Sequence, residues 1–217
     1  GNEGDISGNF TGIRTLTGTN ATLTGENATT NTWTLTGANA GTYNNGSETL
    51  TFSGVTNVAG GTGSDTLVGT SGADTMSSSA NETIQVTGSV TASEIENVDG
   101  GGGADAITLS HDFTSVTGGA DDDTLTYVSG TIGTLTGGAG TGDELVGPSG
   151  GATFTLNGSG SGTVSTQAFS AIENVTGGAG VDTFNFTGTS SYTTVSGGAG
   201  NDQFNVASGS TTTANLA

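Results

Sequence analysis

Short segments in which apolar and polar residues alternate recur along the chain, and they predict β-strands. An apolar side chain at every second position turns one face of an extended strand toward a core and the other toward water. No segment sustains the spacing of an amphipathic helix. The alternation is clearest in residues 34–36, 84–86, 107–109, 125–127, 154–156 and 184–186. We therefore expect an all-β protein made of short strands.

A glycine-rich segment with the pattern apolar-x-Gly-Gly-x-Gly-x-Asp-x-apolar separates many of these strands. Asp121 replaces the third glycine in one copy, and another copy carries an extra residue, Gly142. Glycine enters positive φ freely, so each copy predicts a tight turn. The copies run from Val58 to Leu67, Val98 to Ile107, Val116 to Leu125, Leu135 to Leu145, Val175 to Phe184 and Val195 to Phe204.

The turns recur at a nearly constant spacing. The apolar residues two positions before a turn glycine follow one another at similar intervals, except between Val58 and Val98, where the interval is twice as long. We expect that longer interval to hold an unmarked turn near Ser78. A fixed period with short strands is typical of a parallel β-solenoid, a β-roll or β-helix, and here it predicts about ten coils of about 20 residues each. The markers are Leu16, Leu35, Val58, Val98, Val116, Leu135, Leu156, Val175 and Val195.

The motif divides this continuous solenoid into three parts. Residues 1–57 keep the turns but lack the motif aspartate, and residues 58–206 carry the repeat with its aspartate, except in the turn around Gly158. Residues 207–217 are small and polar, so we expect a C-terminal tail or an assembly edge.

Composition narrows the range of partners. The chain has 217 residues with 42 glycines, and 20 acidic residues against one Lys or Arg give a net charge of −19. Such a surface repels nucleic acid and anionic lipid and attracts cations. There is no cysteine for a disulfide, and no apolar run reaches the length of a membrane span. We expect neither nucleic-acid binding nor membrane insertion.

Two consecutive nonapeptides, Gly60 to Val68 and Gly69 to Ser77, resemble the RTX repeat Gly-Gly-x-Gly-x-Asp-x-apolar-x. In that family two nonapeptides form one coil of a parallel β-roll, and the turns bind Ca²⁺ between coils. The lead-ins Ile95 to Gly101 and Ile172 to Gly178 resemble repeats of large bacterial surface adhesins, including filamentous haemagglutinin-like proteins. The resemblance covers residues 58–206. Only residues 60–79 hold two RTX-like units per coil, so we do not expect a full double row of calcium sites.

Stacked turns would place motif aspartates above one another, Asp105, Asp123, Asp143, Asp182 and Asp202 in nearly one column. Carboxylates about 5 Å apart repel by roughly 0.8 kcal/mol in bulk water and more at lower dielectric. Ca²⁺ accepts six to eight oxygen ligands and would remove this repulsion. The run Asp121-Asp122-Asp123 is the densest cluster and the first choice for an ion. The candidate ligands are Asp65, Asp74, Asp105, Asp121, Asp122, Asp123, Asp143, Asp182 and Asp202.

A second interpretation needs no metal. Aspartate side chains accept backbone N–H groups of their own turns, so these residues could be turn formers only. The pairs Glu96-Asn97 and Glu173-Asn174 are expected to be solvated or to join internal hydrogen-bond ladders.

Catalytic residues are not expected. His111 is the only histidine, and its neighbours Ser110 and Asp112 suggest a triad only in sequence, since triad geometry does not follow from adjacency. Asp143 and Glu144 could pair as acids, but no substrate cleft is implied.

These observations favour an extracellular structural or adhesive module, secreted or on a bacterial surface. It would be stiffened by Ca²⁺ and belong to a large adhesin, or stack end to end into a filament such as those of an extracellular matrix. The alternative is an ice- or glycan-binding module with a flat Thr-rich face, built from Thr-x-Thr elements at residues 15–17, 22–24, 34–36 and 124–126. A polysaccharide-processing solenoid enzyme is the less favoured third hypothesis.

Overall fold

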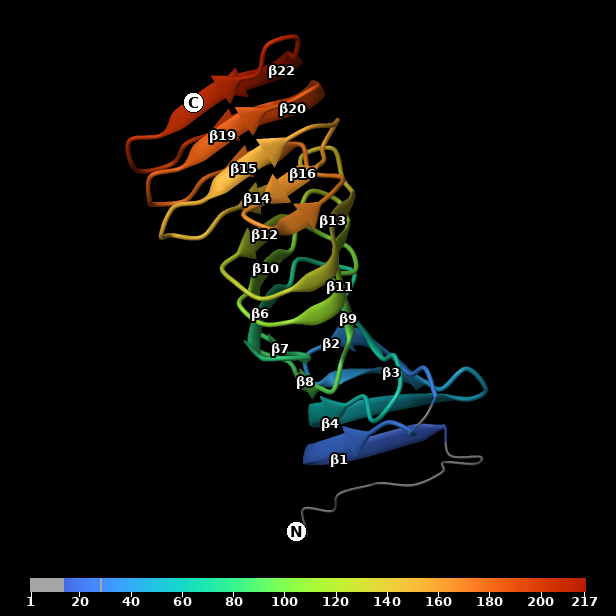
Figure 1. Cartoon of the computed structure of the whole chain (residues 1–217). Coiled ribbons are helices and arrows are strands. Elements are labelled where there is room, and N and C mark those ends of the chain that lie inside the picture. Colours follow the sequence, from blue (N-terminus) through green and yellow to red (C-terminus); the bar gives the residue numbers. More distant parts are fainter. Residues whose placement is uncertain (1–13, 28) are drawn as a thin grey trace.

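The chain forms a rising stack of short β-strands in the computed structural model, which describes residues 14–27 and 29–217 (Figure 1). No helix occurs in those residues. Strands from successive coils pair in parallel, which confirms the predicted all-β parallel solenoid. The strands fall into four parallel ladders, numbered here in the order in which the chain first reaches them.

The four ladders follow one another around the solenoid. The first holds β1 (Thr15–Thr24), β4 (Thr49–Ala59) and β8 (Thr91–Ser93). The second holds β2 (Thr32–Gly37), β5 (Thr66–Val68), β9 (Asn97–Asp99), β11 (Phe113–Ala120) and β13 (Ile132–Ala139). The third holds β6 (Thr75–Ala80), β10 (Ala106–Leu109), β12 (Thr124–Tyr127), β14 (Glu144–Val146), β18 (Asn174–Thr176), β20 (Thr189–Ser196) and β22 (Thr211–Leu216). The fourth holds β15 (Thr153–Leu156), β19 (Thr183–Phe186) and β21 (Gln203–Val206).

The core is a column of apolar side chains that point inward from each ladder. In the second ladder Val98, Val116 and Leu135 pair across successive coils and are buried. In the fourth, Phe184 stacks between Phe154 and Phe204, with ring centroids 4.7 Å and 4.9 Å away. Along each ladder, equivalent positions therefore stack on one another, so modest apolar side chains suffice to fill the interior.

Antiparallel hairpins lengthen three of the coils. They add β3 (Ala40–Asn44), β7 (Thr83–Val86), and β16 (Gly162–Val164) with β17 (Gln167–Phe169). The coil from β10 to β12 contains no hairpin, whereas the coil from β6 to β10 contains β7 and is correspondingly longer. Coil length is therefore not uniform, which corrects the constant spacing expected from the sequence. Ser78 does not mark a hidden turn, because it lies in β6 and pairs with Ile84 of β7.

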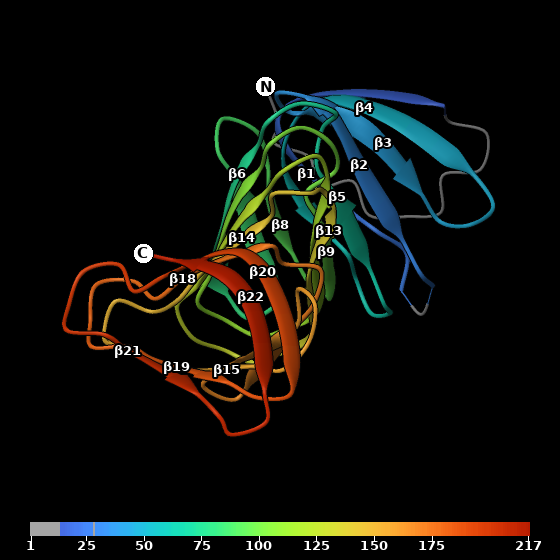
Figure 2. The same ribbon diagram turned by 90° about the horizontal axis from the view of Figure 1, so that it is seen from above.

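The stack shifts sideways as it rises. The early coils use the first three ladders, and the last coils use the third and fourth. Seen from above, the first strands lie to one side of the last ones (Figure 2). Each glycine turn therefore joins one ladder to the next, and which two ladders it joins depends on its height in the stack.

One of the two predicted segment limits falls inside a strand, because residue 57 lies within β4. The other coincides with the end of β21 at Val206, and residues 207–217 include β22, which pairs with β20. Residues 1–13 and 28 of the first predicted segment lie outside the described residues. Within the described parts of the chain, no helix has the length and apolar character to span a membrane.

Candidate metal centre

Each full turn is built around its first two glycines and its aspartate. In the turn from β11 to β12, a Cβ on Gly118 would collide with Oδ2 of Asp123 and with the carbonyl oxygen of Gly137. Gly119 follows with φ of +117°, a conformation that side chains disfavour. The first glycine thus makes room for the aspartate and the second reverses the chain, which folds the carboxylate inward.

The inward carboxylates link successive coils through their Oδ1 atoms. The backbone N–H of Asp74 donates to Oδ1 of Asp105 over 2.6 Å. The N–H of Asp105 donates to Asp123 and that of Asp123 to Asp143, each over 2.8 Å. We call Asp74, Asp105, Asp123 and Asp143 the central row. Each of the last three accepts from the coil before it, so the row is a ladder rather than a set of separate turns.

The aspartates do not form one column, which corrects the sequence prediction. Asp182 and Asp202 form an upper row of their own, in which the N–H of Asp182 donates to Oδ1 of Asp202 over 2.9 Å. Their turns join the third ladder to the fourth, whereas the central row joins the second to the third. Asp65 lies at a third corner, where its Oδ1 accepts the N–H of Asn31. The rows change corners because the hairpin coils shift the register.

Five carboxylates place their second oxygen in the interior without a donor. The Oδ2 atoms of Asp65, Asp105, Asp123, Asp143 and Asp182 are buried and have no hydrogen-bond partner. These side chains are at most 2% exposed. Arg14 is the only Lys or Arg in the sequence, and it precedes β1 at the N-terminal end of the described stack. A buried carboxylate oxygen with neither donor nor cation is costly, so these positions favour a bound cation.

The same burial raises the pKa of these groups. Burial, with a contribution from neighbouring aspartates, raises the pKa of Asp105 to about 7 and that of Asp123 to about 6. Burial also raises the pKa of Asp65, Asp143 and Asp182. Hydrogen bonds to the carboxylates act in the opposite direction but do not cancel the effect of burial.

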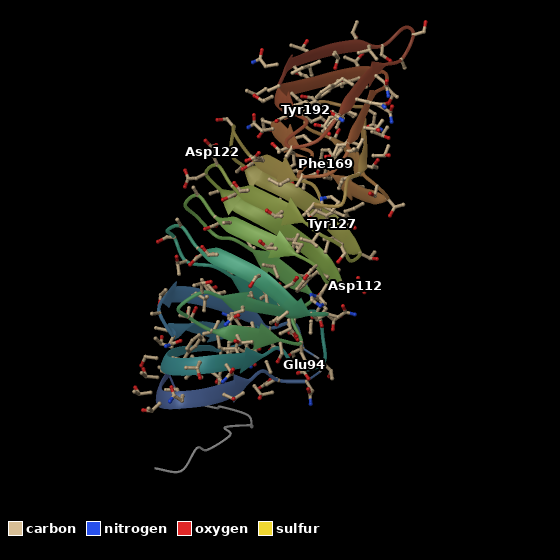
Figure 3. All side chains as sticks on the ribbon, turned by 90° about the vertical axis from the view of Figure 1, so that its left-hand side faces the viewer. Glu94, Asp112, Asp122, Tyr127, Phe169 and Tyr192 are labelled. Carbon is tan, nitrogen blue, oxygen red and sulfur yellow. The ribbon has the colours of Figure 1, made fainter. Side chains whose placement is uncertain are left out.

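The other predicted ligands lie at the edges of the rows. Asp74 starts the central row and accepts the N–H of Thr70. Asp202 is half-buried because it lies in the last coil. Asp121 and Asp122, part of the first-choice cluster, are exposed and accept backbone N–H groups of adjacent coils. Figure 3 shows Asp122 at an outer edge of the stack, and only Asp123 of this run turns inward.

The pairs Glu96-Asn97 and Glu173-Asn174 join internal hydrogen-bond ladders, which was one of the two alternatives expected from the sequence. Oε2 of Glu96 accepts the N–H of Asp65 over 2.5 Å, and Oε2 of Glu173 accepts the N–H of Asp143 over 3.1 Å. Asn97 and Asn174 donate to carbonyl oxygens of the preceding coil. Sequence reasoning missed that these glutamates lie next to the aspartate rows. The available signal was the Ile-Glu-Asn-Val segment shared by residues 95–98 and 172–175.

The donor set suits a hard cation that also uses backbone oxygens. No group of three or more His, Cys, Asp or Glu side chains converges on one point within the described residues. Carboxylate oxygens and turn carbonyls nevertheless lie together, as at Asp123 and Gly137. Ca²⁺ accepts such mixed oxygen ligands, whereas zinc prefers nitrogen and sulfur. The buried unpaired Oδ2 atoms are therefore the positions that fit calcium.

Comparison with known protein families decides the class of repeat. The family model of the RTX calcium-binding nonapeptide repeat (4 copies) matches residues 51–81 and 194–212. The chain carries RTX repeats. RTX nonapeptides bind calcium, so Ca²⁺ is the cofactor of the repeats in these two segments. Neither a curated protein nor a solved structure matches the chain significantly.

The matched RTX segments contain the turns of Asp65, Asp74 and Asp202. The turns of Asp105, Asp123, Asp143 and Asp182 lie outside them but share with the Asp65 turn an inward carboxylate whose Oδ2 has no hydrogen-bond partner. The geometry of the RTX turn thus extends through the middle of the chain, where the spacing of the repeat is irregular.

The residues of three alternative sites considered from the sequence have other partners or positions in the structure. Nδ1 of His111 lies 2.9 Å from Oγ of Ser110 and 3.3 Å from Oγ of Ser78, whereas Asp112 accepts the N–H of Thr131. The Thr-x-Thr elements belong to three different ladders, so they do not form one flat face. Asp143 is buried in the central row, while Glu144 accepts the hydroxyl of Thr176.

Proposed function

We propose that this RTX chain is a structural module of an extracellular or cell-surface protein, in which calcium ions hold the coils together. The observation that carries the proposal is the set of five buried, unpaired Oδ2 atoms. In the calcium-free state these charges repel each other and lack solvation. Bound ions neutralise them and connect adjacent coils, so the module would be stiff only where calcium is abundant.

The module suits an adhesin or a filament because its coils stack along one axis. Among the described strands, β21 pairs only with β19 and β22 pairs only with β20. This last coil exposes Val206 and Leu216, which are 54% and 50% exposed, and half-buried Phe204. An open strand edge beside apolar side chains is a template for another coil. We propose end-to-end stacking with a second copy as the mode of assembly.

Calcium titration tests the proposal directly. Isothermal calorimetry with CaCl₂, with MgCl₂ as control, should show binding at more than one site and selectivity for calcium. Thermal melts should shift upward in calcium relative to EGTA. A site at 100 times its Kd adds about 2.7 kcal/mol, and each kcal/mol corresponds to about 2–4 °C for a chain of this size. Absence of both the heat and the shift would refute calcium stiffening.

A further inference from the structure

Glu96 and Glu173 occupy equivalent positions, Glu96 beside Asp65 and Glu173 at the end of the central row. Asp65 is alone at its corner, and we count it below as a row of one aspartate. Thr66 pairs with Asn97, which places Glu96 opposite Asp65, and Glu144 pairs with Asn174, which places Glu173 opposite Asp143. Both glutamates therefore take the place that an aspartate of the next coil would hold. The next coil has Thr114 or Thr193 at that register, so the acidic rows stop there.

The two segments reach this position with the same local structure. Glu94 and Ala171 have φ of +55° and +49°, and buried Ile95 and Ile172 follow them. Each isoleucine N–H donates to a carbonyl oxygen of the inserted segment, over 3.0 Å in both cases. Two independent hairpin coils thus end in one arrangement, which brings a glutamate back to the row.

Backbone and carboxylate oxygens meet at both ends. A Cβ on Gly60 would collide with the carbonyl oxygen of Glu94 and with Oδ2 of Asp65. A Cβ on Gly137 would meet the carbonyl oxygen of Ala171 and Oδ2 of Asp143. Both Oδ2 atoms are buried and have no hydrogen-bond partner.

Each glutamate can add a second carboxylate at these points. One oxygen accepts the N–H of the row aspartate, and a carboxylate has further lone pairs for a cation. A neutral hydrogen-bond acceptor would have satisfied the N–H equally well. The charge of the glutamate is instead placed beside a carboxylate that already lacks a partner. Such a pair is stable when a divalent cation lies between the two groups.

We propose that Glu96 and Glu173 are calcium ligands that close the rows, each completing a terminal site with Asp65 or Asp143. This inference rests on the proposed calcium function and extends it to residues outside the Gly-Gly-x-Gly-x-Asp motif. Each hairpin coil then supplies the last ligand of one row of calcium sites, and the next row begins at another corner of the solenoid.

The test uses Glu173→Gln and Glu96→Gln in the whole chain, with calcium stoichiometry measured by calorimetry. Glutamine keeps an oxygen to accept the N–H of Asp143 or Asp65, so melting in EGTA should not fall. We expect each variant to lose one calcium ion, or to weaken one site at least tenfold, and the double variant to lose two. Glu144→Gln is the matched control, because it removes the same charge beside Asp143 from a side chain that bonds to Thr176.

The outcomes separate the two proposals. Wild-type stoichiometry and affinity in both variants, or an equal loss in Glu144→Gln, would overturn the role of the glutamates while leaving calcium stiffening intact. No calcium binding by the wild type would refute both proposals. If one variant fails to fold, the other tests the same arrangement at an independent row.

Discussion

The backbone N–H of Asp105 donates to Oδ1 of Asp123 in the following coil, over 2.8 Å. Each of these buried carboxylates in the central row therefore has one oxygen that is satisfied by the protein and one that is not. The hydrogen bond fixes the side chain in the interior, where its charge is poorly solvated. The stability of the coils should therefore depend on whether a proton or a bound cation neutralises that charge.

Acid should stabilise the calcium-free protein. The pKa of Asp105 is raised to about 7 and that of Asp123 to about 6 from a usual value of 3.8, so the folded state binds protons that the unfolded state does not. This contribution is fully present below about pH 4 and is lost as pH rises through 6 to 7. We expect a higher melting temperature in EGTA at pH 5 than at pH 8.

Calcium should reverse this dependence, because its ligands must be deprotonated. The gain in melting temperature on adding calcium should therefore be larger at pH 8 than at pH 5. A melting temperature in EGTA that is flat or rises from pH 5 to pH 8 would contradict a buried charge in the central row.

Asp123→Asn should separate the structural role of the side chain from its charge. The amide keeps an oxygen for the N–H of Asp105, and its nitrogen can donate toward the carbonyl oxygen of Gly137. We expect a rise in melting temperature in EGTA at pH 8 of about 2–4 °C, which corresponds to about 1 kcal/mol, and a smaller response to calcium. Asp122→Asn, at an exposed neighbour, should change neither quantity. Equal effects of the two substitutions would show that overall charge, rather than the buried position, matters.

Gly118→Ala should destabilise the stack, because the added Cβ would meet both Oδ2 of Asp123 and the carbonyl oxygen of Gly137. Overpacking of this kind costs about 1–3 kcal/mol, which chemical denaturation can measure. Gly150→Ala is the control, since no atom lies within 4 Å of its added Cβ. A loss of stability in the control as large as that in Gly118→Ala would show that glycine is needed for flexibility and not for space.

Charge on the last coil should prevent end-to-end assembly. Val206→Lys and Leu216→Lys place a cation beside the open edges of β21 and β22. We expect self-association, measured by sedimentation velocity in calcium, to weaken at least tenfold in the double variant. Thr108→Lys together with Val128→Lys, at exposed positions in the middle of the stack, controls for the same change in net charge. Association that persists in the double variant would place the contact elsewhere.

The sequence by itself determined the strands, the glycine turns and the inward aspartates. These depend on local chemistry, namely alternation along a strand, glycine where no Cβ fits, and an acid at a fixed distance from the glycine pair. The position of Asp123 relative to Gly118 could therefore be predicted from a single repeat.

Only the tertiary structure decided which aspartates share a row. Asp143 and Asp182 have nearly the same local motif, yet they lie at different corners because the coil that contains β15, β16 and β17 separates them. The pairing of the hairpin strands is not encoded in the spacing of the glycine-aspartate motif. The distance along the chain between two turns therefore could not show where a hairpin is inserted. For the same reason the sequence could not decide whether Glu96 and Glu173 are solvated or join internal ladders, and they meet Asp65 and Asp143 only after the inserted strands have folded back.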